Sequence, residues 1–401
     1  MKSLKRCTCI FMAVLALISC KKKDSVESIT EDELFTLSYG NFEEQLNLFS
    51  LNDIGSVQTG ICMKDGFFYI VNGESQKIME LNSYGDLLTL FYNEDSDTKN
   101  LMDSAGASSV SLHREISYPF GYTGLISVDS NKCMYIVCTI PRDRQELSED
   151  GNLLYCQTVL RIPRDGNQID YIGQQGPGGT PFPFIRDIYT TEKNELVVVS
   201  TGPSGLMVYW FADDGFLKYM VPVNSTDAPK ISGIDEDSDV FLTVENVIPD
   251  PGDYRFYVKI DNYSSYSDRA SKAQAGVSYI NTLLYPLDIS SGLYGNPVSV
   301  PPYEESVTVD YSKLTYKIPY DFLGVTKNGW KFFVISTTSG FDVEMIHTES
   351  QKVLHRHFDV NRSNVLFHNM SLSDDGIISA LYIGPDSARV VWYRTDKLIS
   401  N

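Results

Sequence analysis

The stretch that decides the fold is DGFFYIVNGESQKIMELNSYGDLLTLF, residues 65–91. It contains three short runs of β-forming residues, FFYIV, KIMEL and LLTLF, and small polar residues close each run. Such runs are typical of strands joined by tight hairpins. Because two or three strands alone are only marginally stable in water, we expect the rest of the chain to repeat this unit and to cover its faces.

A polar turn followed by a run of β-formers recurs along the whole chain. Asn-Gly and Asp-Gly pairs in several of these turns favour the positive φ angles that tight hairpins require. Most copies are followed by a third and a fourth β-run, and hydrophobic residues show little helical periodicity. The six copies are MKDG-FFYIV (63–71), DSNKC-MYIV (129–137), EKNE-LVVVS (192–200), DEDSD-VFLTV (235–244), TKNG-WKFFVIS (326–336) and SDDG-IISAL (373–381).

Four antiparallel strands repeated every 40–65 residues or so are typical of β-propeller blades, which cover each other's faces when they stack. The predicted fold is therefore all-β, a six-bladed propeller of four-stranded antiparallel blades. A wide gap separates the fourth turn from the fifth. We interpret it as an insertion at about 246–280 in the fourth blade. The alternative is a seventh blade built from residues 253–261 and 281–289.

The sixth copy lacks a fourth strand, because only TDKLISN follows ARVVWYR (388–394). Two unmatched β-like runs lie near the start of the chain, LFTLSYG (34–40) and QLNLF (45–49). We predict that one of these N-terminal runs completes the last blade. Such a closure would remove two exposed sheet edges.

The first residues read as a targeting signal. Basic MKSLKR precedes the apolar run CTCIFMAVLALIS, which is shorter than the roughly 20 residues that a membrane-spanning helix needs. The run ends in Leu17-Ile18-Ser19-Cys20, which resembles the bacterial lipobox. The resemblance implies cleavage before Cys20 and lipidation of that cysteine; an ordinary secretory signal is the alternative. We therefore expect a signal peptide at 1–19, a tether at 20–33 and one propeller domain at 34–401.

The net charge and the cysteine content limit the partners and the disulfides that we expect. The chain of 401 residues has a net charge of −19, so its surface repels phosphate backbones and nucleic acid is not an expected partner. An exported protein can form disulfides. Cys138 and Cys156 could pair across neighbouring strands, and unpaired cysteines buried in strands are the alternative. Cys62 and Cys133 are the other two cysteines that follow Cys20. The cysteine spacing does not match a zinc site.

Two stretches resemble a known repeat family. YIVNGESQKIMELNSYGDLL (69–88) is similar to the NHL repeat of six- and seven-bladed propellers. GQQGPGGTPFPFIRDIYTTEKNELVVVSTG (173–202) resembles the segment between two blades of that family and the two strands that follow it. With the lipobox, the chain resembles bacterial envelope lipoproteins with an NHL-like propeller. The resemblance implies a membrane-anchored protein that faces the periplasm or the cell surface, and Lys21 agrees with sorting to the outer membrane.

Loops that join second to third strands, and fourth strands to the next blade, share one face of an antiparallel ring. The long insertions, at 94–118, 139–157, 174–183 and about 246–280, all belong to these classes, so one elaborated face is expected to bind a ligand or partner. Instead of binding a ligand, the aromatic residues on this face could pack between blades. Arg186 and Asp187 could likewise form a local ion pair. The candidate binding residues are Tyr118, Phe120, Tyr122, Phe182, Phe184, Arg186, Asp187, Tyr320, Asp321 and Phe322.

No spacing of residues points to a catalytic group. His355 and His357 lie on one side of a strand and could chelate a metal with His347 or His368, but we interpret them as part of a solvated outer edge. The motifs for a nucleophile elbow, a phosphate loop and a calcium loop are absent. Acidic or amide residues do occur on predicted first strands. These are Asp129, Asp187, Asp235, Asp321 and Asn369.

The sequence thus favours a monomeric, lipid-anchored propeller that binds an envelope protein or a small ligand as a scaffold, without catalysis and without a cofactor. The alternative is a metal-dependent hydrolase of the propeller lactonase type. In that case the acidic and amide residues of the first strands would hold a divalent ion in the central channel.

Overall fold

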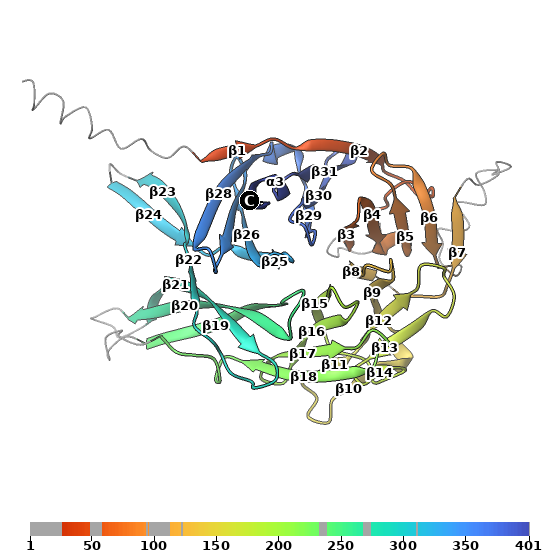
Figure 1. Cartoon of the computed structure of the whole chain (residues 1–401), viewed down its shortest axis with the longest axis horizontal. Coiled ribbons are helices and arrows are strands. Elements are labelled where there is room, and N and C mark those ends of the chain that lie inside the picture. The colour runs from red at the N-terminus through yellow and green to blue at the C-terminus, as the bar shows by residue number, and fades with distance from the viewer. Residues whose placement is uncertain are drawn as a thin grey trace, which may run out of the picture.

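A computed structural model describes residues 26–48, 58–93, 95, 113–121, 123–231, 239–267, 274–309 and 312–400. Six sheets stand around a central axis, with the first strand of each sheet innermost (Figure 1). The predicted six-bladed propeller is confirmed. The predicted signal peptide, Cys20 and Tyr122 lie outside the described residues. No helix in the described ranges has the length and apolar character needed to cross a membrane.

Each blade is a meander of four strands, which are named in order from the axis outward. Blades 1 to 3 consist of β3 (Thr59–Lys64), β4 (Phe67–Asn72), β5 (Lys77–Leu81) and β6 (Leu87–Tyr92); β8 (Thr123–Val128), β9 (Met134–Thr139), β12 (Gln157–Ile162) and β13 (Asp170–Gly173); and β15 (Ile185–Thr190), β16 (Leu196–Gly202), β17 (Gly205–Phe211) and β18 (Leu217–Asn224). Blades 4 to 6 consist of β19 (Asp239–Pro249), β20 (Arg255–Ser267), β21 (Gln274–Asp288) and β22 (Val298–Val300); β25 (Asp321–Val325), β26 (Trp330–Thr337), β27 (Gly340–His347) and β28 (Lys352–Asp359); and β29 (Phe367–Leu372), β30 (Ile378–Ile383), β31 (Ser387–Tyr393) and β2 (Asp32–Ser38).

The N-terminal strand β2 closes the ring, as predicted. It pairs antiparallel with β31 as the fourth strand of blade 6. Phe35 and Leu37 of β2 enter the hydrophobic core between blades 6 and 1, together with Leu46 and Leu48 from the loop that follows. Residues 32–48, which we call the clasp, therefore join both ends of the chain. The ordered fold also begins before residue 34, because β1 (Glu27–Ile29) and the start of β2 lie within the expected tether.

Three blades differ from the predicted four strands because each carries a fifth. β7 (Arg114–Ser117) runs parallel to β6, β1 runs parallel to β28, and β14 (Gly176–Pro177) is antiparallel to β13. Two further two-stranded sheets pair β10 (Glu146–Leu147) with β11 (Leu154–Tyr155), and β23 (Tyr303–Val309) with β24 (Ser312–Ile318). The helical turns described are short: Gly73–Ser75, Arg142–Arg144, Arg362–Asn364 and α3 (Asp396–Ile399).

Blade 4 corrects one part of the sequence analysis. VFLTV (240–244) lies in the first strand, β19, rather than in the second. The turn of this blade is at residues 250–254, and the stretches proposed for a seventh blade belong to β20 and β21. In the described parts of this range, 246–267 and 274–280, no separate insertion interrupts the blade. Its extra residues instead lengthen β20 and β21 to 13 and 15 residues, and others form the β23–β24 hairpin after β22.

Two kinds of contact hold neighbouring blades together. Apolar side chains from facing sheets form buried clusters, such as Val208, Trp210, Phe256 and Val258 between blades 3 and 4. On the face formed by the tight first turns, charged residues link adjacent blades: Lys64 Nζ lies 2.5 Å from Asp374 Oδ2, and Lys132 pairs with Asp65. Asp65 and Gly66 both have positive φ, which confirms the expected hairpin geometry.

All four cysteines in the described residues are free thiols. Cys138 on β9 is buried, and burial raises the pKa of the Cys62 thiol to about 11. Cys138 and Cys156 therefore do not form a disulfide, and Cys138 serves as a small core residue.

Candidate functional site

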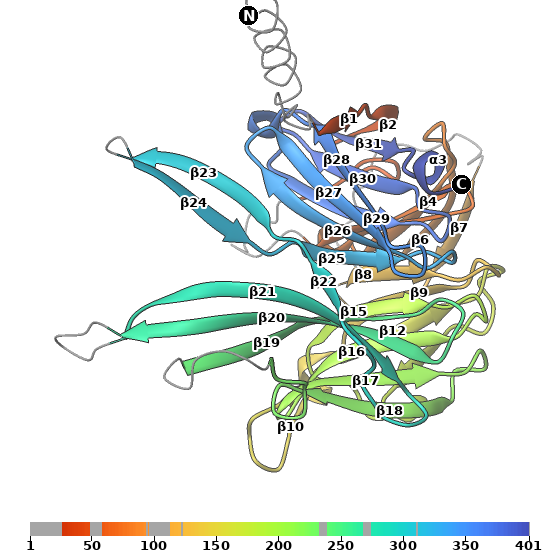
Figure 2. The same ribbon diagram turned by 60° about the vertical axis from the view of Figure 1, so that its left-hand side comes forward.

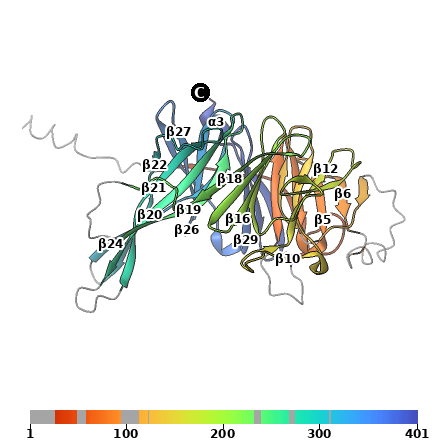
Figure 3. The ribbon, with the colours of Figure 1, turned by 90° about the horizontal axis from the view of Figure 1, so that it is seen from below.

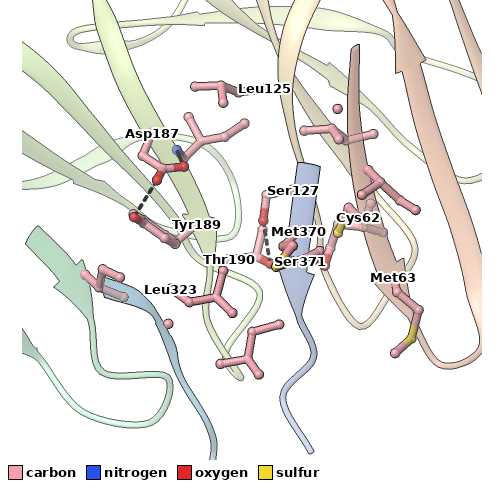
Figure 4. A pocket seen from close by; sticks show the side chains of 18 of the residues that line it. Cys62, Met63, Leu125, Ser127, Asp187, Tyr189, Thr190, Leu323, Met370 and Ser371 are labelled. Atoms are coloured by element: carbon pink, nitrogen blue, oxygen red, sulfur yellow. Dashed lines mark hydrogen bonds between the residues drawn. The ribbon is translucent and has the colours of Figure 1, made fainter. Parts of the chain in front are cut away.

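The innermost strands of all six blades surround a central channel with a cavity of about 290 Å³. Its wall combines apolar and polar side chains (Figure 4). Leu125, Leu323 and Met370 contribute apolar surface, while Ser127 and Thr190 form a hydrogen bond of 3.1 Å between their hydroxyl groups. The channel can accommodate a small molecule, but the side chains around it are not dominated by one chemical type.

Asp187 is the principal titratable group of the channel. Its carboxylate accepts hydrogen bonds from the Tyr189 hydroxyl at 2.7 Å and from the Ile188 amide at 2.9 Å. Burial raises the pKa of Asp187 to about 6, and the two hydrogen bonds only partly oppose this effect. A carboxyl group of this kind can both donate and accept hydrogen bonds near neutral pH.

We expect Asp187 to make folding stability depend on pH. Its pKa is raised from 3.8 to about 6 in the folded state, so between these values the folded chain holds a proton that the unfolded chain has released. Stability from this group is therefore lost as the pH rises through that interval. Asp187→Asn should be more stable than the wild type at pH 7.5 by roughly 1 to 2 kcal/mol, after allowance for the open channel, and should show no such advantage at pH 3.5. Urea denaturation at both pH values tests this expectation, which fails if the difference between the two proteins is the same at each pH.

The acidic and amide residues of the first strands do not converge on one point. Asp129 accepts a hydrogen bond from the Cys133 amide in the turn after β8, and Asn369 accepts one from the Ile61 amide at 2.9 Å. Asp321 is exposed at the start of β25, and Asp235 lies outside the described residues. Among the described members of this set, Asp187 is the only carboxylate that lines the channel cavity. The arrangement does not favour the metal-dependent hydrolase.

The predicted binding residues separate into buried and accessible groups. Phe120, Phe182, Tyr320 and Phe322 are buried in the hydrophobic cores between blades, in agreement with the packing alternative for the aromatic residues. Tyr118 is half-buried and packs against Tyr171, with ring centroids 6.0 Å apart. The accessible members of the described set are Phe184, Arg186 and Asp321, with Asp187 open to the channel.

The elaborated face carries two long projections instead of a rim of aromatic residues. Figures 2 and 3 show the outer ends of β20 and β21, and the β23–β24 hairpin, extending from the same side of the ring. We call the outer parts of β19, β20 and β21 the blade-4 arm and the β23–β24 hairpin the second arm. Sequence reasoning did not identify these arms: the second arm, at 303–318, is not among the predicted insertions, and the one predicted at about 246–280 proves to be part of the long strands of the blade-4 arm.

The second arm exposes a row of apolar side chains. Cross-strand pairing places Val307 opposite Leu314, and Glu305 opposite Tyr316, on one face of the hairpin. Val307, Leu314 and Tyr316 are exposed by 40%, 45% and 52%. Both edges of this two-stranded sheet lack a neighbouring strand in the described residues. An isolated hairpin of this kind is marginally stable, so its apolar row is suited to contact with another surface.

The blade-4 arm carries an aromatic ladder. Phe241, Tyr263 and Tyr279 occupy neighbouring positions on three strands, with ring centroids 5.6 and 5.9 Å apart. Further toward the ring, on the same face of the sheet, Lys259 Nζ donates to Asp261 Oδ2 at 2.6 Å. This ion pair is almost fully buried and also receives a hydrogen bond from Thr282. The pair lies where the arm leaves the ring, and the hydrogen bond from Thr282 links β20 to β21.

His355 and His357 point to the same side of β28, as predicted, but the interpretation as an outer edge was wrong. β1 pairs with the outer edge of β28, and both imidazoles contact the carboxylate of Asp342 on β27. Desolvation alone would raise the pKa of Asp342, yet hydrogen bonds from the two histidines outweigh it and lower that pKa. His347 and His368 do not join this group: the first binds Asn328 and Ser350, and the second packs on Phe341.

Glu344, next to this group, was missed by the sequence analysis. It is 5% exposed, and burial raises its pKa to about 7. The signal that could have revealed it is alternation, because Asp342, Glu344 and Ile346 share one side of a strand whose other side is apolar.

Comparisons with known proteins add no identification. The chain matches no known family model and no curated protein. Among solved structures, it is similar to streptogramin B lyase, with 12% identity over 86% of this chain and 95% of that one and a TM-score of 0.34. It is also similar to the calcium-binding protein regucalcin from Agrobacterium tumefaciens, with 10% identity, coverage of 92% and 95%, and a TM-score of 0.40. Polysaccharide lyase Uly1 shares 7% identity, with coverage of 92% and 99% and a TM-score of 0.40. Similarities of this size support no inference about activity.

Proposed function

We propose that this chain is a lipid-anchored binding module of a bacterial cell envelope that engages a protein partner through its two arms and does not catalyse a reaction. The observation that carries the proposal is the exposed row of Val307, Leu314 and Tyr316 on a hairpin that projects alone from the ring. Contiguous exposed apolar surface commonly marks a site of interaction, and a hairpin without support gains stability when a partner covers its apolar face.

The channel is consistent with a scaffold role. Its wall contains both apolar and polar residues, and the described carboxylates do not converge as the chemistry of a metal-dependent hydrolase would require. Membrane attachment rests on the sequence alone, through the lipobox at Leu17–Cys20. We propose acylation at Cys20, anchoring in the outer membrane with the propeller facing the periplasm or the cell surface, and a monomeric state.

The experiment compares two adjacent residues of the second arm in a bacterium that processes lipoproteins. Leu314→Asp places a charge in the apolar row, whereas Thr315→Asp places the same charge on the opposite, polar face of the hairpin. We expect wild type and both variants in the membrane fraction. After cross-linking and quantitative mass spectrometry, a specific partner should be recovered with wild type and Thr315→Asp but reduced about tenfold with Leu314→Asp, since a buried charge would cost at least about 1.4 kcal/mol of binding energy.

Two results would contradict this proposal. Recovery of the wild-type chain in the soluble fraction would contradict the proposed lipid anchor. Equal recovery of partners by the two aspartate variants, or loss of a self-association by Leu314→Asp alone, would show that the row does not bind a different envelope protein.

A further inference from the structure

Three potential metal ligands from two separate segments meet at the outer side of blade 1. Glu43 lies in the clasp after β2, His113 directly precedes β7, and Glu115 belongs to β7. Nε2 of His113 lies 3.3 Å from Glu43 Oε2 and 3.7 Å from Glu115 Oε1. Donor atoms of all three residues lie within 4.8 Å of one another, which no other trio of His, Cys, Asp and Glu achieves in the part of the chain that the structure describes.

Hydrogen bonding alone does not account for this arrangement. Nε2 of an imidazole carries at most one proton and can donate it to one acceptor. At 3.7 Å, Glu115 lies beyond hydrogen-bond distance of this nitrogen. Two carboxylates held this close repel each other unless a cation lies between them. The side chain of His113 is only 11% exposed, whereas those of Glu43 and Glu115 are 34% and 39% exposed, so water screens the two carboxylates only in part.

We propose that Glu43, His113 and Glu115 bind one divalent transition-metal ion, with Zn²⁺ as the best match. A tetrahedral zinc ion with nitrogen and oxygen ligands at 2.0–2.1 Å holds neighbouring ligand atoms about 3.3 Å apart. The distances of 3.3 and 3.7 Å from the imidazole nitrogen are therefore already close to those of a coordinated set. An imidazole with two carboxylates suits zinc better than Ca²⁺ or Mg²⁺, which prefer oxygen ligands alone.

The position of this site gives the ion a structural role. Polar contacts already fasten the clasp to blade 1: Asn72 exchanges two hydrogen bonds with Asn47, and Lys77 Nζ donates to the Phe42 carbonyl at 2.6 Å. A metal ion that joins Glu43 to His113 and Glu115 would add a link between the clasp and β7. Metal binding would then stabilise the closed ring, because the ligands lie together only in the folded chain.

The test uses the full chain, purified in detergent, treated with EDTA and then titrated with Zn²⁺ in a calorimeter. We expect one equivalent to bind and to raise the thermal midpoint by a few degrees at saturation. His113→Ala and Glu115→Gln should each lower the affinity at least tenfold. Two controls should bind zinc as the wild type does: Glu44→Gln, which makes the same change of charge as Glu115→Gln but at the residue next to Glu43, and His355→Ala, which alters the other group of histidines.

Three outcomes would overturn the proposal. They are no zinc binding by the wild type, binding that survives both His113→Ala and Glu115→Gln, and binding that is lost in His355→Ala. In the first case, the three side chains form an ion-pair group around a protonated imidazole.

Discussion

A chain that begins at residue 49 will not unfold as a cooperative domain, whereas a chain that begins at residue 31 will be nearly as stable as the intact protein. The shorter chain lacks Phe35, Leu37, Leu46 and Leu48, all buried between blades 6 and 1. At about 1.5–3 kcal/mol for each side chain, their loss amounts to roughly 6–12 kcal/mol, which is comparable to the total stability of a typical domain. It also exposes the edge of β31, which favours aggregation.

The chain that begins at residue 31 is the matched control because it loses only β1 from the described part of the protein. Glu27 and Ser28 of β1 are exposed, Ile29 is only partly buried, and in the ion pair between Glu27 and Arg356 the glutamate side chain is 74% exposed. We expect a cost of about 1 kcal/mol or less. Chemical denaturation followed by tryptophan fluorescence, with gel filtration, measures both effects. Equal midpoints for the two truncated chains would refute the role of the clasp.

Asp261→Asn is expected to lower the free energy of unfolding by about 3–5 kcal/mol. The side chains of Lys259 and Asp261 are only 4% and 2% exposed. Removal of one charge leaves the other buried without compensation, and such changes are strongly destabilising. Asparagine keeps an oxygen that can accept the hydrogen bond from Thr282, so the variant isolates the effect of charge. Urea denaturation of the purified chain provides the measurement.

Two variants make this prediction specific. Asp375→Asn removes the same charge from an exposed ion pair with Lys327, and we expect a cost below about 1 kcal/mol. The double variant Lys259→Met with Asp261→Asn removes both buried charges and should recover most of the lost stability. If Asp261→Asn and Asp375→Asn cost the same, or if the double variant is no more stable than Asp261→Asn alone, burial of the ion pair does not stabilise the arm.

Local patterns were sufficient where a structural unit is defined by neighbouring residues. Asp65-Gly66 indicated a hairpin because glycine, asparagine and aspartate adopt the positive φ angles of the turn more readily than other residues do. Counting strands then predicted six blades and an N-terminal strand in the last one. The method failed in blade 4, where the turn between Pro249 and Tyr254 lacks an Asn-Gly or Asp-Gly pair and β20 and β21 continue beyond the blade.

The candidate sites were less accessible to sequence reasoning. Alternation placed His355 and His357 on one side of a strand, but their partner Asp342 depends on the register between β27 and β28. Phe120, Phe182 and Tyr320 were predicted to lie on a binding face, with packing between blades as the alternative, and only the stacking of the blades decided that they are buried. The sequence of the second arm shows a strand pattern. The exposure of its apolar row, however, follows from the absence of a neighbouring sheet in the described residues.

The sequence by itself therefore determined the type of unit, its number and the need for a closing strand, because turns and period-two alternation are set by residues close together in the chain. The tertiary structure alone brought Glu43 beside His113 and Glu115, and buried Lys259 with Asp261 in the base of an arm. These contacts depend on how the ring closes and on the register of paired strands. Both are fixed by the packing of the whole molecule, which no short segment encodes.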